Sequence, residues 1–560
     1  MSHVVDLAPV LGNREPQVPL VGVFGPRRIG VAALEVRQVP LRDVDRLGLV
    51  LHEDVDHPVV LHHVDGADLL GAEHAEAAAL HHGRAAHAER RYDDAQVELL
   101  AELVRFKTVH EDGIANAENP EFRAFVAHLR ERAQEFGFDF TDYGGILVIG
   151  LGDGKARLGI VTHGDVQPAD ASKWRKSPFE LDVTSEPGRL IARGAEDDKA
   201  PIATAMHAMK AISELGLPLN RRIELIVALT EESDWAPFRE ALTRYAPPPM
   251  NIAIDSQYPV VVAEKGFGAL RVTFAAGDAG GEGPFVESYG GGAFLSQVPE
   301  DAHLVLGGVN EELLARLRTR TAGGDNGVTW RLESNGGKLT VHAKGKAAHS
   351  SKPEHGINAL TYIANLLDGE TLRDSATARA LDFVNTLIGT GLYGEQFGDA
   401  AYAHSFMGPL TVNLSTVRTT EDGTELAINL RAPAGKSPAT LERELRDAIA
   451  AWANARDIPI PAIEAELNAA YLPEQPSQVE PLLAVFRHYT GMNDAGPVSI
   501  GGASNAQLMP NAVNFGPSMP GVPYTGHSEH EFITREQMTL NLRMYTAMLA
   551  LLATNRPTSP

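Results

Sequence analysis

Residues 158–165 read LGIVTHGD and residues 222–232 read RIELIVALTEE, and these two stretches decide the fold. Each is a short apolar run of the kind that forms a buried strand. Between them, apolar residues recur at helical spacing from about Pro201 to Leu215, and Gly216 follows as a stop signal. A strand, a helix and a second strand in this order predict a βαβ unit and a mostly parallel sheet.

The same pattern continues on both sides of this unit. Asn119-Pro120 is a helix-start signal and Gly137 is a helix-stop signal. Further helices are predicted at about 95–104, 120–136, 481–489 and 535–552, and further strands at 145–151 and 251–255. We therefore expect an α/β fold with a mixed, mostly parallel sheet flanked by helices.

Residues 266–472 differ from their surroundings. Glycine pairs such as Gly280-Gly281 and Gly323-Gly324 separate short strand-like runs, which predicts an α+β domain inserted into the first. A chain of 560 residues is long enough for about two to four domains. The expected parts are an N-terminal extension at 1–92, the α/β domain at 93–265 and 473–560, and the inserted domain at 266–472.

The first 92 residues have neither a lasting helical period nor a lasting strand period. They contain no lysine but hold a cluster of histidines between His52 and His87, whose irregular spacing makes a poor metal site. Three interpretations compete: a flexible metal-binding extension, a propeptide, or upstream DNA translated from a misassigned start codon. We favour the last. A charged start followed by an apolar run, the mark of a secretory signal, is not visible.

The composition excludes several classes of function. The net charge of −24 argues against a surface that binds nucleic acid, because such a surface needs basic residues to neutralise phosphates. No apolar run approaches the roughly 20 residues needed to span a bilayer. With 44% hydrophobic and 22% charged residues, the chain is typical of globular proteins. Because there is no cysteine, any metal must be held by histidines and carboxylates.

Five short segments carry side chains that suit a metal site. Taken singly they are weak signals, because His163 followed by Asp165 resembles a surface histidine and acidic residues at a helix start are ordinary caps. Glu231 and Glu232 are more informative, since two adjacent carboxylates at a strand end repel unless a cation is near or one is protonated. The five segments are Thr162–Asp165, Arg193–Lys199, Thr230–Ser233, Ile254–Ser256 and His527–Glu531.

Together the segments are a strong signal. They supply two histidines and three carboxylates at one edge of the predicted sheet, where open α/β sheets bind their ligands. Two zinc ions about 3.5–4 Å apart need one carboxylate that bridges them. Five protein ligands, one of them bridging, give three per metal and leave a position open for water, which indicates a catalytic site.

The segments THGDVQPAD, ARGAEDDKAP, TEES, IDSQYPVVVAEKG, KAAHSSKPEHGINAL and GHSEHEFI resemble, in this order, those of the zinc peptidase family of aminoacylase, carboxypeptidase G and PepV-type dipeptidases. The likeness extends from about Asp94 to Leu552. It is greatest to the PepV-type dipeptidases, whose IGGGTYARAMPN-like segment corresponds to IGGASNAQLMPN at 500–511.

The resemblance assigns the metal ligands residue by residue. It implies that His163 and Asp255 hold one zinc, that Glu232 and His527 hold the other, and that Asp197 bridges both. It also implies a cis peptide bond between Asp197 and Asp198. Manganese and cobalt suit the same ligands as zinc.

Three further roles follow from the same resemblance. Glu231 is expected to be the general base, which takes a proton from the attacking water and delivers it to the leaving amine. Asp165 is expected to orient His163. His349, in the inserted domain, is expected to reach over the site and stabilise the oxyanion. The inserted domain is then a lid, and its doubled size compared with that of the dimeric carboxypeptidases predicts a functional monomer.

The chain departs from the PepV-type pattern at the substrate. Gln507 stands where those enzymes carry an arginine for the C-terminal carboxylate, and Ser296 where the family usually has asparagine. A neutral amide cannot pair with a carboxylate as a guanidinium does. Arg431 and Lys265 are therefore candidates for the missing cation, although either is equally typical of a structural ion pair.

We expect a di-zinc enzyme that cleaves dipeptides or short peptides, because position 255 is aspartate as in the family's dipeptidases. An N-acyl-amino-acid or N-succinyl deacylase on the same scaffold is the alternative, and a binding protein with a dead site is a weaker one. The expected partner is a small peptide, without nucleic acid or membrane. The expected compartment is the cytoplasm, or the periplasm if the true N-terminus differs.

Overall fold

The computed structural model describes residues 3–4, 50–51, 82–277, 282–323, 326–474 and 476–554. The chain separates into two compact units, Met1–His81 and His82–Pro560. Apart from the short strands β1 (His3–Val4) and β2 (Val50–Leu51), every described element belongs to the second unit. Most of the N-terminal histidine cluster, from His52 to His81, lies outside the described residues.

The first large sheet is the mixed α/β sheet that the sequence predicted. Its strand order is β23-β10-β24-β8-β5-β7-β4-β3. The neighbours β23–β10, β24–β8, β8–β5 and β5–β7 are parallel, and the other pairs are antiparallel. The strands are β3 (Asp139–Asp142), β4 (Ile146–Leu151), β5 (Arg157–His163), β7 (Arg222–Ala228), β8 (Asn251–Ala253), β10 (Val261–Glu264), β23 (Val498–Ile500) and β24 (Ala512–Asn514).

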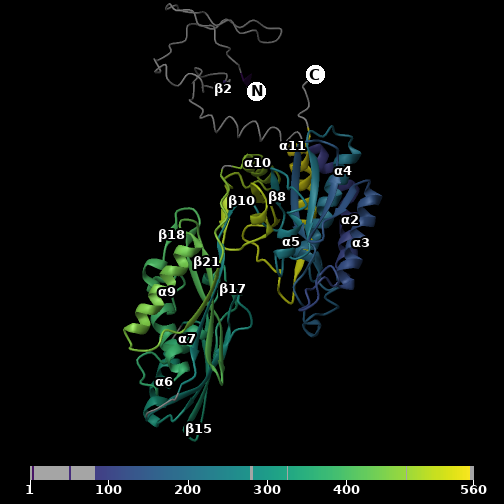
Figure 1. The fold of residues 1–560 in the computed structure, drawn as a ribbon. Helices are drawn as coiled ribbons and strands as arrows, with labels where there is room; N and C mark the ends of the chain where they lie inside the picture. The colour runs from purple at the N-terminus through teal and green to yellow at the C-terminus, as the bar shows by residue number, and fades with distance from the viewer. Residues whose placement is uncertain are drawn as a thin grey trace, which may run out of the picture. The chain divides into compact units, whose positions relative to one another are not determined.

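Helices cover both faces of this sheet. Helices α2 (His82–Leu103), α4 (Ala200–Glu214) and α11 (Arg535–Ala553) pack against one another, and α4 and α11 contact β7 (Figure 1). On the other face, α5 (Ala236–Ala241) and the short helix η7 (Asn505–Leu508) share a core with residues of β4, β5, β7 and β8. Helices α3 (Pro120–Phe136) and α10 (Val479–Thr490) complete this part of the chain.

Most predicted elements were confirmed within a few residues, but the start of the first helix was wrong. Helix α2 begins at His82 and not at about Ala95, so residues 82–92 are helical and do not belong to an unstructured extension. The buried residues of its first turns are Ala85 and Ala88. Alanine adds little to an apolar periodicity, which explains why the pattern did not show the helix there.

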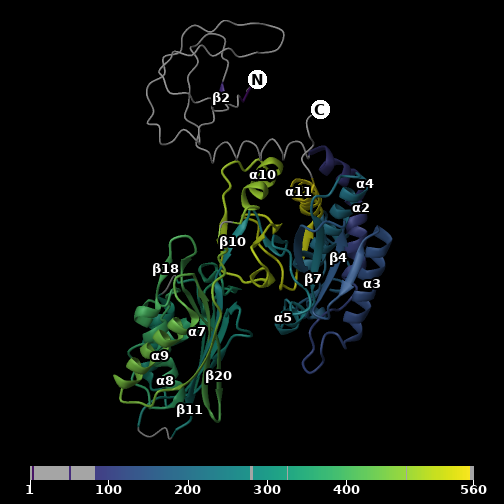
Figure 2. The same cartoon turned by 45° about the horizontal axis from the view of Figure 1, so that its top comes forward.

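The second large sheet lies within residues 266–467 and is entirely antiparallel. Its strand order is β15-β16-β14-β12-β20-β21-β11-β22, and its position in the chain makes it the inserted lid (Figure 2). The strands are β11 (Gly266–Ala275), β12 (Phe285–Gly291), β14 (Asp301–Gly307), β15 (Thr329–Asn335), β16 (Lys338–Lys344), β20 (Thr411–Thr420), β21 (Gly423–Ala432) and β22 (Ala462–Leu467).

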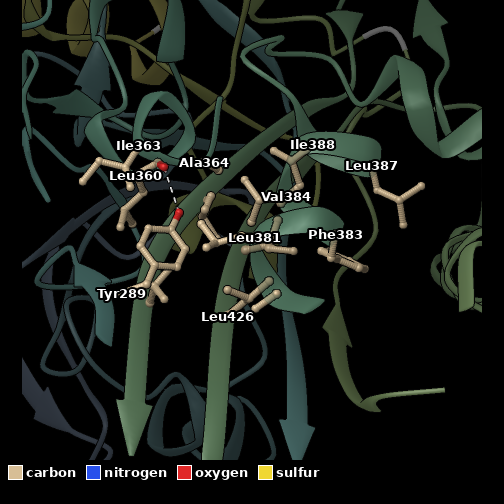
Figure 3. Packing of buried hydrophobic residues seen from close by; sticks show 14 of the residues in the cluster. Tyr289, Leu360, Ile363, Ala364, Leu381, Phe383, Val384, Leu387, Ile388 and Leu426 are labelled. Atoms are coloured by element: carbon tan, nitrogen blue, oxygen red, sulfur yellow. Dashed lines mark hydrogen bonds between the residues drawn. The ribbon is translucent and has the colours of Figure 1, made fainter. Parts of the chain in front are cut away.

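One face of the lid sheet carries the lid's own apolar core. Alternate residues of its strands pack with helices α6 (Glu311–Ala322), α7 (Ala359–Leu366), α8 (Ala376–Phe383) and α9 (Pro438–Asn454). Figure 3 shows Tyr289 in this core, where its hydroxyl donates a hydrogen bond of 2.8 Å to the carbonyl of Leu360. The lid therefore has a core separate from that of the α/β part. Among the described helices of the chain, none is both long and apolar enough to cross a membrane.

Candidate metal centre

The five predicted ligands converge, and they form two groups that share one carboxylate. Ligand atoms of His163, Asp197 and Asp255 lie within 4.8 Å of one another, and so do ligand atoms of Asp197, Glu232 and His527. In the first group, Nε2 of His163 is 2.7 Å from Oδ1 of Asp197 and 3.5 Å from Oδ1 of Asp255. In the second, Nε2 of His527 is 3.0 Å from Oδ2 of Asp197 and 2.9 Å from Oε1 of Glu232.

The sheet explains why these side chains meet. His163 is the last residue of β5, Glu232 follows the end of β7, and Asp255 follows the end of β8. Because β5 is parallel to both β7 and β8, the three strands end at the same edge. Asp197 reaches this edge from the turn before α4, where the Asp197-Asp198 peptide bond is cis, as the resemblance implied.

Asp165 contacts the chain segment of Glu231 and Glu232 as well as His163. Its main-chain carbonyl accepts a hydrogen bond of 3.0 Å from Nδ1 of His163, while its carboxylate oxygen Oδ1 lies 3.5 Å from that nitrogen. The carboxylate accepts the main-chain N–H groups of Glu231, at 3.0 Å, and Glu232, at 2.9 Å. Asp165 therefore holds the end of β5 and the end of β7 in register at the site.

Glu531 and Arg193 support the main chain that carries Asp197. Oε1 of Glu531 accepts the N–H groups of Glu196, at 2.9 Å, and Asp197, at 3.1 Å, and Oε2 pairs with Nη1 of Arg193 at 2.7 Å. Both side chains of the pair are buried. Glu531 is therefore bonded to the segment that carries Asp197.

Glu231 is the one acid of the cluster whose carboxylate is free. Within the described residues, no hydrogen-bond donor or cation contacts its side chain, whereas Glu232 accepts hydrogen bonds from Gln167 and His527. Burial, together with the negative charges of Asp255, Glu232 and Asp197, raises the pKa of Glu231 well above its usual value. A free carboxylate with a raised pKa is suited to accept a proton.

The charge balance of the cluster favours bound cations. Burial and the charges of neighbouring acids raise the pKa of Asp255 to about 6, while His163 and His527 hold the pKa of Asp197 well below its usual value against the effect of burial. Like charges packed this closely stay ionised only when positive charge is near. Imidazole nitrogens and carboxylate oxygens without thiolates are the ligands that zinc, manganese and cobalt share. The side chains present therefore fit a pair of divalent metal ions.

The lid residue His349 lies within electrostatic reach of His527, and Arg431 lies beside His349. His349 is part of the short strand β17 (Ala348–His349). The surrounding protein and the positive charges of Arg431, His527 and Lys352 lower its pKa to about 3, although part of its surface is exposed. The guanidinium of Arg431 is buried and bonds only to Asn429 and Ser350, at 3.0 and 3.4 Å, so it lacks a carboxylate partner among the described residues.

The other substrate-binding candidates are placed less directly. Lys265 is buried and donates a hydrogen bond to the carbonyl of Pro409. Gln507 lies in η7, and its side chain faces the buried carboxylate of Glu264, whose charged form it helps to stabilise. None of the hydrogen bonds in the described part of the chain joins either residue to the five ligands. A close approach of Ser351 to Gly501 does connect the lid segment around His349 to the segment that contains Gln507.

The sequence did not indicate that the charged residues Glu196 and Arg193 support the segments that carry the ligands. Glu196 and Arg193 lie in the quoted segment ARGAEDDKAP, yet a charged residue beside a metal ligand has no periodicity or spacing that separates it from a surface residue. Their burial was the missing signal, because a buried charge is almost always paired for a reason.

Known proteins resemble this chain in sequence and in fold. "Putative dipeptidase YtjP" of Bacillus subtilis (strain 168) is 29% identical over 465 residues, which cover 81% of this chain and 96% of that protein. The "Beta-Ala-Xaa dipeptidase" of Lactobacillus delbrueckii subsp. lactis is 27% identical over 419 residues, covering 74% and 86%. The crystal structure of human carnosine dipeptidase 1 matches with a TM-score of 0.50 at 14% identity, over 84% of this chain and 98% of that one, and supports the fold alone.

A family model gives the assignment. The model of peptidase family M20/M25/M40 matches residues 159–551, which include the lid sheet, most of the first large sheet and all five candidate metal ligands. This match covers more than half of the chain. The chain therefore belongs to peptidase family M20/M25/M40.

Proposed function

We propose that this peptidase hydrolyses dipeptides with two bound divalent metal ions, zinc first and manganese or cobalt as alternatives, and with Glu231 as general base. The observation that carries the proposal is the pair of three-residue groups that share Asp197, with the free carboxylate of Glu231 beside them. His163 and Asp255 would hold one ion, and Glu232 and His527 the other. The two dipeptidase relatives support the substrate class.

The metal ions and Glu231 divide the chemistry. When bound, such ions polarise a peptide carbonyl and lower the pKa of the attacking water. Glu231 takes the proton of this water, because its carboxylate has no competing hydrogen bond, and then gives the proton to the leaving amine.

His349 is suited to stabilise the oxyanion of the tetrahedral intermediate. Its Nδ1 accepts the main-chain N–H of Ser351 at 3.2 Å and lies 2.7 Å from the hydroxyl of that residue. Because Nδ1 is an acceptor, a neutral imidazole carries its proton on Nε2, where it is free to be donated. The low pKa keeps the ring neutral at neutral pH, so it acts as a hydrogen-bond donor and not as a fixed cation.

Arg431 is our candidate for binding the C-terminal carboxylate of the substrate. Its charge affects the pKa of His349, and its guanidinium bonds to Ser350, so it lies beside the oxyanion donor. A buried guanidinium without an acid is uncommon, since buried charges are normally paired. A substrate carboxylate would complete this pairing and would limit the substrate to short peptides with a free C-terminus.

The proposal is tested by the rates of the purified enzyme on a dipeptide, its C-terminal amide, a longer peptide and an N-acyl amino acid, each with added zinc or manganese. We expect the free dipeptide to react fastest. Preference for the N-acyl amino acid would support the deacylase alternative, which the neutral side chain of Gln507 favours. Glu231→Gln is the matched control: it should keep both metals and lose turnover by about 10² to 10⁴-fold.

We also propose that the functional unit is a monomer. His349 of the lid lies close enough to His527 of the same chain for the charge of His527 to lower the pKa of His349, so a second subunit is not needed to supply the oxyanion donor. Sedimentation of the active enzyme should give the mass of one chain. An obligate dimer that loses activity when its interface is mutated would contradict this proposal.

A further inference from the structure

The buried carboxylate of Glu196 makes all its hydrogen bonds to the C-terminal segment that carries His527. Oε2 accepts from the main-chain N–H of Thr525 at 2.7 Å, from its hydroxyl at 2.6 Å, and from the N–H of Gly526 at 3.2 Å. Oε1 accepts from the hydroxyl of Ser518 at 2.9 Å. Glu196 is not one of the metal ligands, and its side chain is 91% shielded from solvent, since only 9% is exposed.

These contacts join three segments that each carry a candidate ligand. Glu196 itself directly precedes Asp197. Gly526 directly precedes His527. Ser518 lies in β25 (Pro517–Ser518), which pairs in parallel with β9 (Ser256–Gln257), and β9 directly follows Asp255. One carboxylate therefore connects the main chains that present ligands to both metal positions.

The segment before His527 is one that needs support. His527 has a φ of 64°, a left-handed conformation that residues with a side chain rarely adopt. The residue before it, Gly526, is packed closely against Tyr524, because an added Cβ would lie 2.1 Å from the hydroxyl of Tyr524. A loop in this conformation keeps its shape only when surrounding contacts hold it, and Glu196 fixes the two N–H groups immediately before His527.

The connection is reciprocal. Glu196 accepts hydrogen bonds from Thr525 and Gly526, on one side of His527 in the chain, while Glu531, on the other side, accepts the main-chain N–H groups of Glu196 and Asp197. The chain around His527 is therefore joined to the Glu196-Asp197 segment twice, once through the carboxylate of Glu196 and once through the carboxylate of Glu531. Three of the four hydrogen bonds of the Glu196 carboxylate go to Thr525 and Gly526, so its removal acts mainly on the loop before His527.

We propose that Glu196 is a positioning residue that sets the metal affinity of the second position, formed by Asp197, Glu232 and His527, through its hydrogen bonds to Thr525 and Gly526. This inference rests on the proposed two-metal function. Without Glu196, His527 loses its fixed position and the second position loses affinity. The first position keeps His163 and Asp255 on the sheet and binds as before.

The test is a count of bound Mn²⁺ per chain, measured by the electron paramagnetic resonance of the free ion during titration of chelator-treated enzyme. Wild type should bind two ions. Glu196→Ala should bind one with unchanged affinity and the other at least tenfold more weakly. Glu196→Gln should stay within about threefold of wild type, because its carboxamide oxygen can replace Oε2 and its amide nitrogen can donate to Ser518. Rescue by glutamine assigns the effect to hydrogen-bond geometry and not to charge.

Glu529→Ala is the matched control, since Glu529 lies in the same segment but bonds to Trp174 and Asp170; it should leave both affinities unchanged. If Glu196→Ala does not fold, Thr525→Val tests the same contact from the other side and should weaken one ion by about threefold or more. Equal weakening of both ions, or of neither, overturns the inference while the two-metal function stands. Fewer than two ions in wild type without dipeptidase activity overturns the proposed function itself.

Discussion

The two candidate metal positions share Asp197 but are built in different ways. The first takes His163 from the end of a central strand, and this imidazole is 1% exposed with its second nitrogen bonded to the carbonyl of Asp165. The second takes His527 from a loop, where the imidazole is 35% exposed and, among the described residues, its Nδ1 has no hydrogen-bond partner. In the first position, His163 and Asp255 lie at the ends of strands. In the second position, hydrogen bonds to the side chain of Glu196 hold the loop that carries His527.

Because of this difference, we expect the second position to lose its metal more easily than the first. The neighbouring parallel strands β5 and β8 end close to His163 and Asp255 of the first position, so metal binding there requires little reorganisation. The second position depends on a loop residue in a disfavoured backbone conformation and on the hydrogen bonds of Glu196. We expect the first metal to be held more tightly and the second to exchange.

The largest effect is expected where the two positions meet. Asp197→Ala removes a ligand from both groups at once, so the protein should lose both metals and essentially all peptidase activity, by on the order of 10⁴-fold or more. Metal analysis of the purified variant beside wild type measures this. Retention of two ions with measurable affinity would show that Asp197 does not bridge.

Single-ligand variants should separate the two positions. His527→Ala should leave about one ion per chain, bound with wild-type affinity, because the strand-end ligands His163 and Asp255 remain. Asp255→Ala should weaken the first position by about 100-fold or more, since even residues behind the ligands contribute about 10- to 100-fold. Competition with a graded series of chelators measures both affinities. Identical behaviour of the two variants would contradict the asymmetry.

The sequence predicted the ligands of both positions, but not what holds the second one. Alternating strands and helices place strand ends together, and a metal site at a strand end can be predicted from the residue that ends each apolar run, as for His163 and Asp255. The ligand His527 lies in no periodic element, and only the resemblance to a known family assigned it. Its supports, Glu196 and Glu531, bond across more than 320 residues of chain, a distance that no local pattern spans.

The fold, too, contains elements that the sequence predicted and elements that it did not. Helices α3 and α4 follow their predicted start and stop signals closely, because Asn119 caps the first and Gly137 ends it in a left-handed conformation. Helix α2 was placed too late because alanines form the buried face of its first turns. The edge strand β23 and the inner strand β24 were also not predicted, since three-residue strands lack a measurable period.

In the lid, Arg431→Met tests the proposed carboxylate partner. Loss of a charge-assisted hydrogen bond of about 1.5–3 kcal/mol should lower kcat/KM for a dipeptide by roughly 10- to 150-fold. The rate on the dipeptide amide should change much less, because this substrate has no carboxylate to lose. Arg331→Met, at an exposed arginine of the same domain, is the control and should change neither rate. Equal losses on both substrates would assign Arg431 a structural role.

Gln507→Arg should have the smallest effect. The sequence alone predicts that this change sharpens the preference for a free carboxylate by about tenfold, unless another cation serves. Because Arg431 is buried without an acidic partner, we expect it to be that cation and the gain to stay below about threefold. The measurement is the ratio of kcat/KM for a dipeptide to kcat/KM for its amide, in wild type and in Gln507→Arg. A tenfold gain would show that Gln507 faces the substrate carboxylate.

The most direct test of the account is the anomalous scattering of crystals grown with zinc. We predict two peaks about 3.5–4 Å apart, one beside His163 and Asp255 and the other beside Glu232 and His527, with Asp197 between them. After brief exposure of the crystals to a chelator, the peak beside His527 should weaken first. A single peak, or two peaks that do not share Asp197, would contradict the central claim.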